Sequence, residues 1–336
     1  MRRALASGAK ARDTPIMGRL VEGRWTTEWY KPDAAGRFVR ESASFRGRIT
    51  ADGSSGFPAE AGRYHLYVSL ACPWAHRTLI VRALRKLEDA ITISIVDPFM
   101  AEHGWTFSDA PGAIRDTVNG ADHLHQIYVK ARPDYTGRVT VPVLWDKQQG
   151  VIVNNESREI IRMLDTEMRA LGDAAVDLAP EPLRAEIDRI LDTIYTPINN
   201  GVYRAGFATK QQAYDDAVVE LFAALDHWDA VLANRRYLCG DVLTEADVCL
   251  FTTLLRFDPV YHGHFKCNLR RIADYPNLSG YVRDIYQTPG VAGTCNIDHI
   301  KQHYYRSHDT INPTRIVPRG PILALDAPHD RARLAK

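Results

Sequence analysis

The sequence predicts an α/β N-terminal domain followed by an all-α C-terminal domain, and three observations lead to this fold class. Residues 64–70 form an aromatic and β-favouring run that leads directly into helical apolar spacing after Pro73. A second β-rich run, 139–145, contains a proline, and from about residue 180 the apolar residues recur at helical spacing. The 336 residues are enough for two domains with ordinary cores.

Composition excludes several classes of partner. The 42 basic and 41 acidic residues balance, so we expect no binding to nucleic acid or to an anionic membrane. No apolar run approaches the length of a membrane span, so we expect no membrane partner. The five cysteines lack metal-ligand or disulfide spacing, which is typical of a protein of the reducing cytoplasm. They are Cys72, Cys239, Cys249, Cys267 and Cys295.

The N-terminal 60 residues are expected to lie outside the main body. Residues 1–16 are basic but lack the apolar core of a secretory signal, which favours a disordered leader over a transit peptide, with Met17 as an alternative start. Residues 17–60 are too aromatic for a free linker and too polar for a core. We therefore predict an extended arm packed on the body, with residues 46–53 near the active cleft.

Cys72 lies where the first strand gives way to a helix, whose first position suits Pro73. Backbone N–H groups and the positive end of the helix dipole favour a thiolate there, and His76 and Arg77 add positive charge nearby. We predict a nucleophilic sulfur with a lowered pKa, the alternative being a small buried hydrophobic residue. Because position 75 is alanine, the sulfur must exchange with an external thiol.

Residues 91–96 alternate as a second strand, which completes a parallel βαβ unit with a right-handed crossover. Residues 97–138 show no clear periodicity and are predicted to be a long loop. Residues 139–145 and 151–153 predict a β-hairpin, and residues 154–157 begin another helix.

This order of elements, with a cysteine at the first helix start and Pro142 opening the third strand, describes a thioredoxin-like domain over residues 61–172. The Val141–Pro142 peptide is expected opposite the Cys72 sulfur. Its backbone groups would bind an extended peptide by strand addition.

The predicted all-helical domain covers residues 180–318, after a boundary within 172–182. Apolar stripes over 183–194 and 214–232 indicate two helices. Thr244 and Asp247 stand near capping-box spacing before a third, and residues 276–286 and 297–305 indicate two more.

Several short motifs resemble the glutathione transferase superfamily, and within it the glutathionyl-hydroquinone reductases of the Xi class. The motifs are Ala71-Cys-Pro-Trp-Ala-His-Arg77, residues 103–105, 139–146, 154–157 and 199–203, and His303-Tyr-Tyr305. The resemblance covers residues 17 to about 318 and implies an all-α glutathione-transferase C-terminal domain. Residues 1–16 and a tail, 319–336, lie outside it.

The resemblance implies an enzyme that removes glutathione from glutathionyl-hydroquinones by using a second glutathione. Cys72 would attack the glutathionyl sulfur, and the mixed disulfide would be resolved by glutathione. Tyr203 and Tyr304 match the family's substrate tyrosines and would bind the ring oxygens, with Tyr261 a weaker candidate. The alternative interpretation is that they are ordinary half-buried tyrosines without a catalytic role.

Glutathione is expected as a co-substrate with its own set of contacts. Ser157 and the helix N–H groups behind it suit the γ-glutamyl carboxylate, Glu156 suits the ammonium group, and the Val141 backbone suits the cysteinyl part. Trp105 would cover the tripeptide, or else anchor its loop. The resemblance also implies a homodimer through the helical domain, for which the 214–232 stripe could supply part of the interface.

No metal is expected, because the histidines at 262, 264, 299, 303 and 308 have irregular spacing. Two other functions stay open. An omega-like thiol transferase or dehydroascorbate reductase would need Cys72 but no phenol-binding tyrosines, and a non-catalytic assembly module would need neither. A conjugating transferase is disfavoured, because Ser69, the nearest hydroxyl for that role, lies before the turn.

Overall fold

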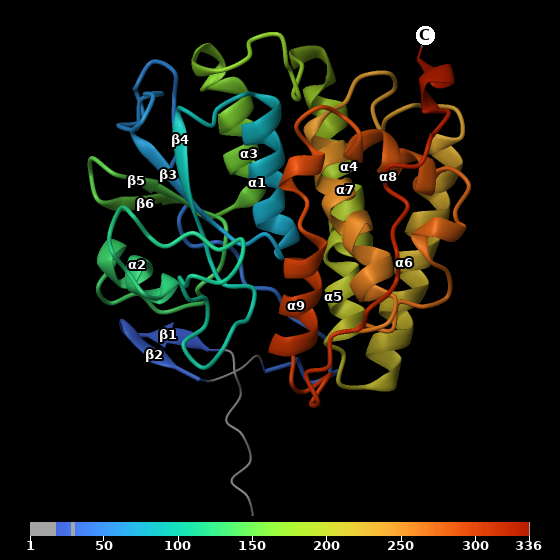
Figure 1. Cartoon of the computed structure of the whole chain (residues 1–336), viewed down its shortest axis with the longest axis horizontal. Coiled ribbons are helices and arrows are strands. Elements are labelled where there is room, and N and C mark those ends of the chain that lie inside the picture. The colour runs from blue at the N-terminus through green and yellow to red at the C-terminus, as the bar shows by residue number, and fades with distance from the viewer. Residues whose placement is uncertain (1–17, 28–30, 336) are drawn as a thin grey trace, which may run out of the picture.

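The structure, a computed structural model, describes residues 18–27 and 31–335. The predicted leader, 1–16, lies outside the described residues. Figure 1 shows a sheet on one side and a group of helices on the other, with α1 and α3 between them. α1 packs against both α3 and α7, so the two parts of the fold share an extended boundary.

The sheet has the order β4-β3-β5-β6. Its strands are β3 (Tyr64–Val68), β4 (Ile91–Ile95), β5 (Val143–Asp146) and β6 (Val151–Asn154). β3 and β4 are parallel and are joined through α1 (Pro73–Leu84), whereas β5 runs antiparallel to β3 and β6. This arrangement confirms the predicted βαβ unit, the hairpin and the thioredoxin-like fold.

Pro142 lies just before β5 rather than inside the strand, and the Val141–Pro142 peptide bond is cis. A proline has no N–H group to donate to a neighbouring strand, so the ladder begins only at Val143. The hairpin strand predicted over 139–145 is therefore shorter at its start than the sequence indicated.

The prediction that residues 97–138 are irregular throughout is wrong, because α2 (Leu124–Ala131) lies within them. This helix has only eight residues and buries Leu124, Ile127 and Tyr128, too few positions for a clear periodic signal. His123 caps its start through a capping box with Gln126, and histidine is an unusual residue at that position.

The N-terminal arm packs along the edge of the sheet domain and contains a small hairpin that the sequence did not indicate, β1 (Arg19–Val21) and β2 (Arg24–Thr26). The backbone of Leu20 exchanges two hydrogen bonds of 2.9 Å with Gly137. Farther along, Arg46 pairs antiparallel with Asn154 of β6. The arm is thus attached to the sheet by backbone pairing.

The remaining helices include all those predicted from the sequence and one short helix, over 201–206, that it did not indicate. They are α3 (Ser157–Thr166), α4 (Arg184–Ile194), α5 (Gly201–Gly206), α6 (Gln211–Leu232), α7 (Glu245–Arg256), α8 (Leu278–Tyr286) and α9 (Ile297–Ser307). Shorter helical turns are η1 (Arg169–Leu171), η2 (Glu181–Leu183), η3 (Tyr195–Asn199), η4 (Phe257–Tyr261), η5 (Ile272–Asp274), η6 (Ala292–Thr294) and η7 (Arg331–Leu334). Over the described part of the chain, no helix has the length and apolar character to cross a membrane.

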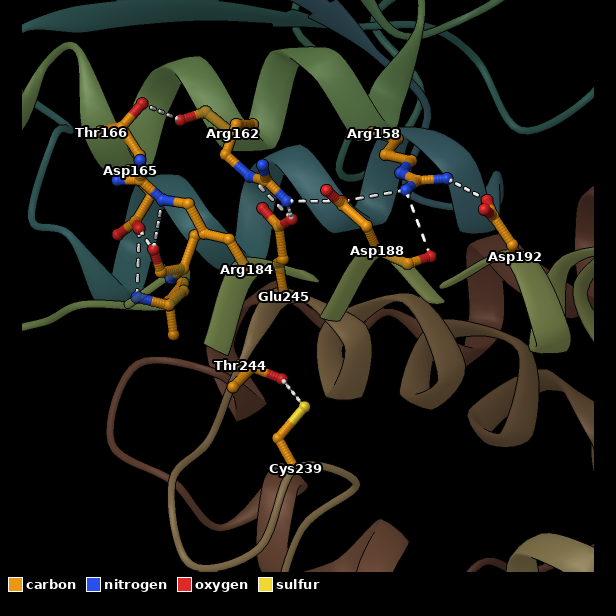
Figure 2. Close-up of polar contacts among 12 residues, drawn as sticks. Arg158, Arg162, Asp165, Thr166, Arg184, Asp188, Asp192, Cys239, Thr244 and Glu245 are labelled. Carbon is orange, nitrogen blue, oxygen red and sulfur yellow. Dashed lines mark hydrogen bonds and ion pairs between the residues drawn. The ribbon is translucent and has the colours of Figure 1, made fainter. Parts of the chain in front are cut away.

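A row of ion pairs fastens α3 to the helical part of the fold (Figure 2). Arg162 of α3 binds the buried carboxylate of Glu245 at the start of α7, and also Asp188 of α4 at 2.9 Å. One turn earlier, Arg158 binds Asp188 at 3.0 Å and Asp192 at 2.7 Å. These contacts fix the start of α3, which forms part of the candidate site, against the helices that carry its other wall.

Candidate active site

A cavity between the sheet domain and the helices brings together all of the predicted site residues except the weaker candidate Tyr261. The predicted residues that line it are Cys72, Trp105, Val141, Pro142, Glu156, Ser157, Tyr203 and Tyr304. The arm contributes Phe38 and residues 40–44, whereas Arg46 and Arg48 line a neighbouring cavity. The prediction that residues 46–53 border the cleft therefore identified the correct arm but placed the contact a few residues too late.

Cys72 is the N-cap residue of α1, with Pro73 at the first helical position as predicted. Its side chain is half-buried, and the thiol donates a hydrogen bond to the Val141 carbonyl oxygen over 3.6 Å. The sulfur thus lies opposite the Val141–Pro142 peptide. The turn is closed by the His76 amide, which donates to the Cys72 carbonyl at 3.0 Å.

The predicted lowering of the Cys72 pKa is wrong for the ligand-free protein. Burial raises the pKa of the Cys72 thiol. The backbone N–H groups of Ala75 and Trp74, at the helix N-terminus, and the charges of Arg256 and Arg40 only partly oppose the rise. His76 does not supply a positive charge, because burial holds its pKa well below the ordinary value. Arg77 turns away towards Ser157, whose hydroxyl oxygen accepts from the guanidinium at 3.2 Å.

Of the two cations that lower the Cys72 pKa, Arg256 at the end of α7 has the larger effect, and the sequence analysis missed it. Its buried guanidinium donates to the carbonyl oxygens of Ala71 at 2.7 Å and Leu70 at 3.0 Å. It also donates to Thr252 O at 2.7 Å and lies 3.1 Å from His76 Nδ1. No acidic side chain in the described part of the chain pairs with it, so its charge is left for a thiolate at Cys72. The only sequence signal was one arginine ending a helix of buried residues.

Three tyrosine hydroxyls meet at the helical wall of the cavity. Tyr203 of α5 and Tyr304 of α9 have hydroxyl oxygens 2.5 Å apart, and Tyr261 at the end of η4 lies 2.9 Å from Tyr304. Burial raises the pKa of all three. Their hydroxyls are therefore protonated at neutral pH and can donate hydrogen bonds. Tyr261 is fully buried behind the other two.

An aromatic and cationic stack joins the cysteine to the tyrosines. The guanidinium of Arg40 lies 4.8 Å from the ring centres of both Trp74 and Tyr203, and its Nε donates to Asn200 Oδ1 at 2.8 Å. The guanidinium carbon of Arg77 lies 4.3 Å from the centre of the Trp74 ring. The buried indole N–H of Trp74 has no hydrogen-bond partner. Trp74 and Arg40 were both missed by the sequence analysis.

The start of α3 presents polar groups to the same cavity. Glu156 is its N-cap, and the Glu156 carboxylate accepts from the Arg158 amide at 3.2 Å. Ser157 is the first helical residue and is buried. Across the cavity, Trp105 stacks on His303 with ring centres 4.7 Å apart, so it is fixed against α9. An anion at Ser157 would meet helix N–H groups and the Arg77 guanidinium.

Two family models match the two halves of this architecture. The glutathione S-transferase N-terminal domain matches residues 71–167, and the glutathione S-transferase C-terminal domain matches residues 211–284. The chain is 55% identical to the glutathionyl-hydroquinone reductase YqjG of Escherichia coli (strain K12), over 94% of this chain and 98% of the relative. It is 53% identical to the glutathionyl-hydroquinone reductase PcpF of Sphingobium chlorophenolicum, over 91% and 96%.

Solved structures agree with these relatives. A Xi-class glutathione transferase from Natrialba magadii superposes with a TM-score of 0.90 at 54% identity, over 97% of this chain and 99% of that chain. The glutathione-bound structure of YqjG superposes with a TM-score of 0.87 at 53% identity, over 94% and 99%. The chain belongs to the Xi class of glutathione transferases. The family resemblance and the fold class predicted from the sequence are thereby confirmed.

The other cysteines of this Xi-class transferase differ from Cys72 in their surroundings. All five thiols are free, and none of the other four lines the cavity. Burial raises the pKa of Cys239, Cys249 and Cys295 to about 11. Cys295 lies behind the site, 3.7 Å from His76 Nε2. Only Cys72 combines access to the cavity with a helix N-terminus.

Proposed function

We propose that this Xi-class transferase is a glutathionyl-hydroquinone reductase that uses Cys72 as its nucleophile. The observation that carries the proposal is the placement of that cysteine and of the Tyr203–Tyr304 hydroxyl pair in one cavity. The two relatives named glutathionyl-hydroquinone reductases, each more than half identical over nearly its whole length, support the same substrate class.

The first chemical step must release an aromatic carbon from sulfur. The substrate first shifts a phenol proton to the ring carbon that bears sulfur, which gives a ketone tautomer without changing its composition. The Cys72 thiolate then attacks the glutathionyl sulfur, so that a sulfur–sulfur bond forms as the sulfur–carbon bond breaks. The electron pair moves into the ring and leaves a phenolate, which is protonated to the hydroquinone.

The second step regenerates the enzyme. The thiolate of a second glutathione attacks the glutathione sulfur of the Cys72 mixed disulfide, which yields oxidised glutathione and the free Cys72 thiolate. The sum of both steps converts a glutathionyl-hydroquinone and glutathione into hydroquinone and oxidised glutathione. No further reductant is needed.

The tyrosines suit the first step because they hold their protons. Tyr203 and Tyr304 would donate hydrogen bonds to the ring oxygens and supply a proton as the ring rearranges. Tyr261 donates to or accepts from Tyr304 and would act by holding that hydroxyl in place. Arg40, stacked over Tyr203, would favour the phenolate that develops on the substrate.

Glutathione would lie between the start of α3 and the Val141–Pro142 peptide. Ser157, the α3 amides and Arg77 would bind the γ-glutamyl carboxylate, and Glu156 would accept from the ammonium group. The Val141 backbone would pair with the cysteinyl part, and Trp105 would cover the tripeptide. Solved glutathione complexes of two relatives support glutathione as the ligand.

A homodimer in the cytoplasm, formed through the helical domain, belongs to the same proposal, but the apolar stripe over 214–232 cannot supply part of its interface. The apolar side of α6, over 214–232, packs into the core of the helical domain and buries Leu221, Leu225 and Trp228. A dimer must therefore use another surface. Light scattering at micromolar concentration tests this part, and a monomer would contradict it.

The decisive experiment combines intact mass with turnover. Incubation with oxidised glutathione should add one glutathionyl group to the wild type and none to Cys72→Ser. In a separate assay, untreated enzyme should consume glutathione continuously when a glutathionyl-hydroquinone is supplied. Modification without turnover on that substrate would instead support the omega-like thiol transferase or dehydroascorbate reductase, and no modification would support a non-catalytic module.

A further inference from the structure

Three histidines converge beside the glutathione cavity, although none was considered as a metal ligand from the sequence. His103 lies in the loop before Trp105, while His123 and His125 stand at the start of α2. One nitrogen from each imidazole lies within 4.8 Å of the other two. His103 is exposed and the other two are half-buried, so an ion could enter from solvent.

The spacing of the rings matches that of ligands around one ion. The ring centres of His103 and His123 are 4.7 Å apart, and those of His123 and His125 are 5.2 Å apart. Zn–N bonds of about 2.0–2.1 Å in tetrahedral geometry place the centres of two ligating imidazoles roughly 5 Å apart. The three nitrogens lie within 4.8 Å of one another and would have to approach to roughly 3.3 Å to bind one tetrahedral ion.

The surrounding contacts hold the cluster in place without using all of its nitrogens. The Thr106 hydroxyl lies 3.3 Å from His123 Nδ1, which leaves Nε2 of that ring for an ion. The ring of Trp25 stacks on His125 at 4.9 Å, and its indole N–H donates to the Glu102 carbonyl oxygen at 2.8 Å. The Thr106–His123 contact is of the kind that orients ligating histidines in metal sites.

The backbone of the loop is shaped for this close approach. Gly104 has a φ of +70°, and a Cβ atom at that position would lie 2.8 Å from the Trp25 ring. Only glycine therefore fits between His103 and Trp105. The carboxylate of Glu102 lies 3.5 Å from His103 Nε2, close enough to orient that ring.

We propose that His103, His123 and His125 form a binding site for one divalent transition-metal ion of the zinc class, with water at the fourth position. Imidazole nitrogen suits Zn²⁺, Ni²⁺ and Cu²⁺, whereas Mg²⁺ and Ca²⁺ prefer oxygen. The ion would join the loop that carries Trp105 to the start of α2. It would thus stabilise one wall of the glutathione cavity and take no part in the cysteine chemistry.

The variants can be chosen to remove imidazoles while keeping the local structure. His123→Asn keeps a residue that caps helices well, and His125→Phe keeps a ring to stack on Trp25. His103 is exposed and can be changed to alanine. His227→Ala removes an exposed histidine elsewhere and is the matched control. Cys72→Ser tests whether the ion binds the catalytic sulfur instead.

The full-length protein, freed of metal by a chelator, is titrated with ZnCl₂ by calorimetry and melted with and without the ion. We expect one equivalent to bind to the wild type, to His227→Ala and to Cys72→Ser, with a higher Tm in each. The triple histidine variant should bind at least 100-fold more weakly and lose the Tm increase, while its Tm without metal stays near that of the wild type.

Unchanged zinc affinity in the triple variant would overturn the proposal, as would loss of binding only in Cys72→Ser. A magnesium titration should show no binding to any variant, and saturable binding of Mg²⁺ at the cluster would also contradict it. Each single histidine variant should weaken zinc binding at least tenfold, since each removes one of three protein ligands. The outcome is independent of turnover on any glutathione substrate.

Discussion

Arg256 donates a hydrogen bond of 2.7 Å to the carbonyl oxygen of Ala71, across 185 residues of chain. The bond joins the end of α7 to the turn that carries Cys72, and a second bond reaches Leu70 O. A cation from the helical part of the fold therefore sets both the position and the electrostatics of a sulfur in the sheet domain. The two parts must be assembled before the nucleophile is complete.

Replacing Arg256 should raise the pKa of Cys72, because the positive charge that opposes the effect of burial is lost. In Arg256→Gln we expect the midpoint of Cys72 alkylation to move up by about one pH unit, with roughly tenfold less thiolate at neutral pH. Arg256→Lys keeps the charge, so its alkylation midpoint should lie between those of the wild type and Arg256→Gln. Arg270→Gln, at an exposed ion pair, is the control and should match the wild type. A midpoint unchanged in Arg256→Gln would mean that the guanidinium acts only on the fold.

The ligand-free wild type should alkylate slowly at neutral pH. Burial raises the pKa of the Cys72 thiol, so the thiolate fraction rises with pH and its midpoint should lie above the ordinary cysteine value of about 8.5. Iodoacetamide labelling of the Cys72 peptide, followed by mass spectrometry from pH 6 to 10, measures this. A midpoint below the ordinary value would restore the expectation drawn from the sequence.

The predicted lowering of the Cys72 pKa failed for a physical reason that the neighbouring residues in the sequence do not reveal. The helix N-terminus and Pro73 were predicted correctly, because both follow from local patterns. The charge assigned to His76 was not available, because the ring is buried and faces Arg256 at 3.1 Å. Desolvation depends on what the rest of the chain brings against a residue, and Arg256 lies 180 positions after His76.

The other site residues divide in the same way, into those that local sequence patterns predicted and those that depend on distant parts of the chain. Val141–Pro142 and Ser157 could be predicted because each lies next to a strand or helix boundary that its own segment specifies. Arg40 lies in an arm without periodicity, and the sequence around Trp74 gave no sign that this residue would line the cavity. His103 precedes His123 by 20 residues, and it meets His123 and His125 because the loop at Thr106 pairs with the start of α2.

Removing Arg162 should destabilise the protein by leaving the Glu245 carboxylate buried without its ion pair. Breaking a buried pair from one side costs about 3–5 kcal/mol, and partial exposure of Arg162 favours the lower end. Urea unfolding of Arg162→Ala measures the loss. Glu245→Gln in the same background should recover part of it, because the neutral amide is less costly to bury.

The loss of stability in Arg162→Ala should also depend on pH, in a direction that the pKa of Glu245 determines. Burial raises the pKa of Glu245, and loss of Arg162 raises it further, since the arginine opposes that effect. A raised carboxyl pKa makes the folded state less favourable above the unfolded value of about 4.3. The difference in free energy of unfolding between the wild type and Arg162→Ala should therefore grow from pH 4 to pH 7. A deficit that is constant over this range would show that lost packing, rather than charge, causes it.

The last prediction separates the proposed reductase from a general thiol transferase by changing the phenols instead of the sulfur. Tyr203→Phe and Tyr304→Phe should each lower kcat on a glutathionyl-hydroquinone by about 10²–10⁴-fold, the usual range for loss of acid–base participation. Exchange on a small glutathione disulfide should change little, because its leaving thiolate needs no ring protonation. Tyr261→Phe should have a smaller effect, since its hydroxyl reaches the substrate only through Tyr304.

Two controls make the result interpretable. Tyr305→Phe removes the neighbouring hydroxyl of α9, which donates to the Pro259 carbonyl at 3.2 Å outside the cavity, and should keep both activities. Cys72→Ser should lose both, because a serine hydroxyl cannot form the mixed disulfide. Equal losses on both substrates in the Tyr203 and Tyr304 variants would assign the tyrosines to glutathione binding or to folding. Full activity on both would leave only the disulfide-exchanging enzyme, in which the 2.5 Å hydroxyl pair has no part in the chemistry.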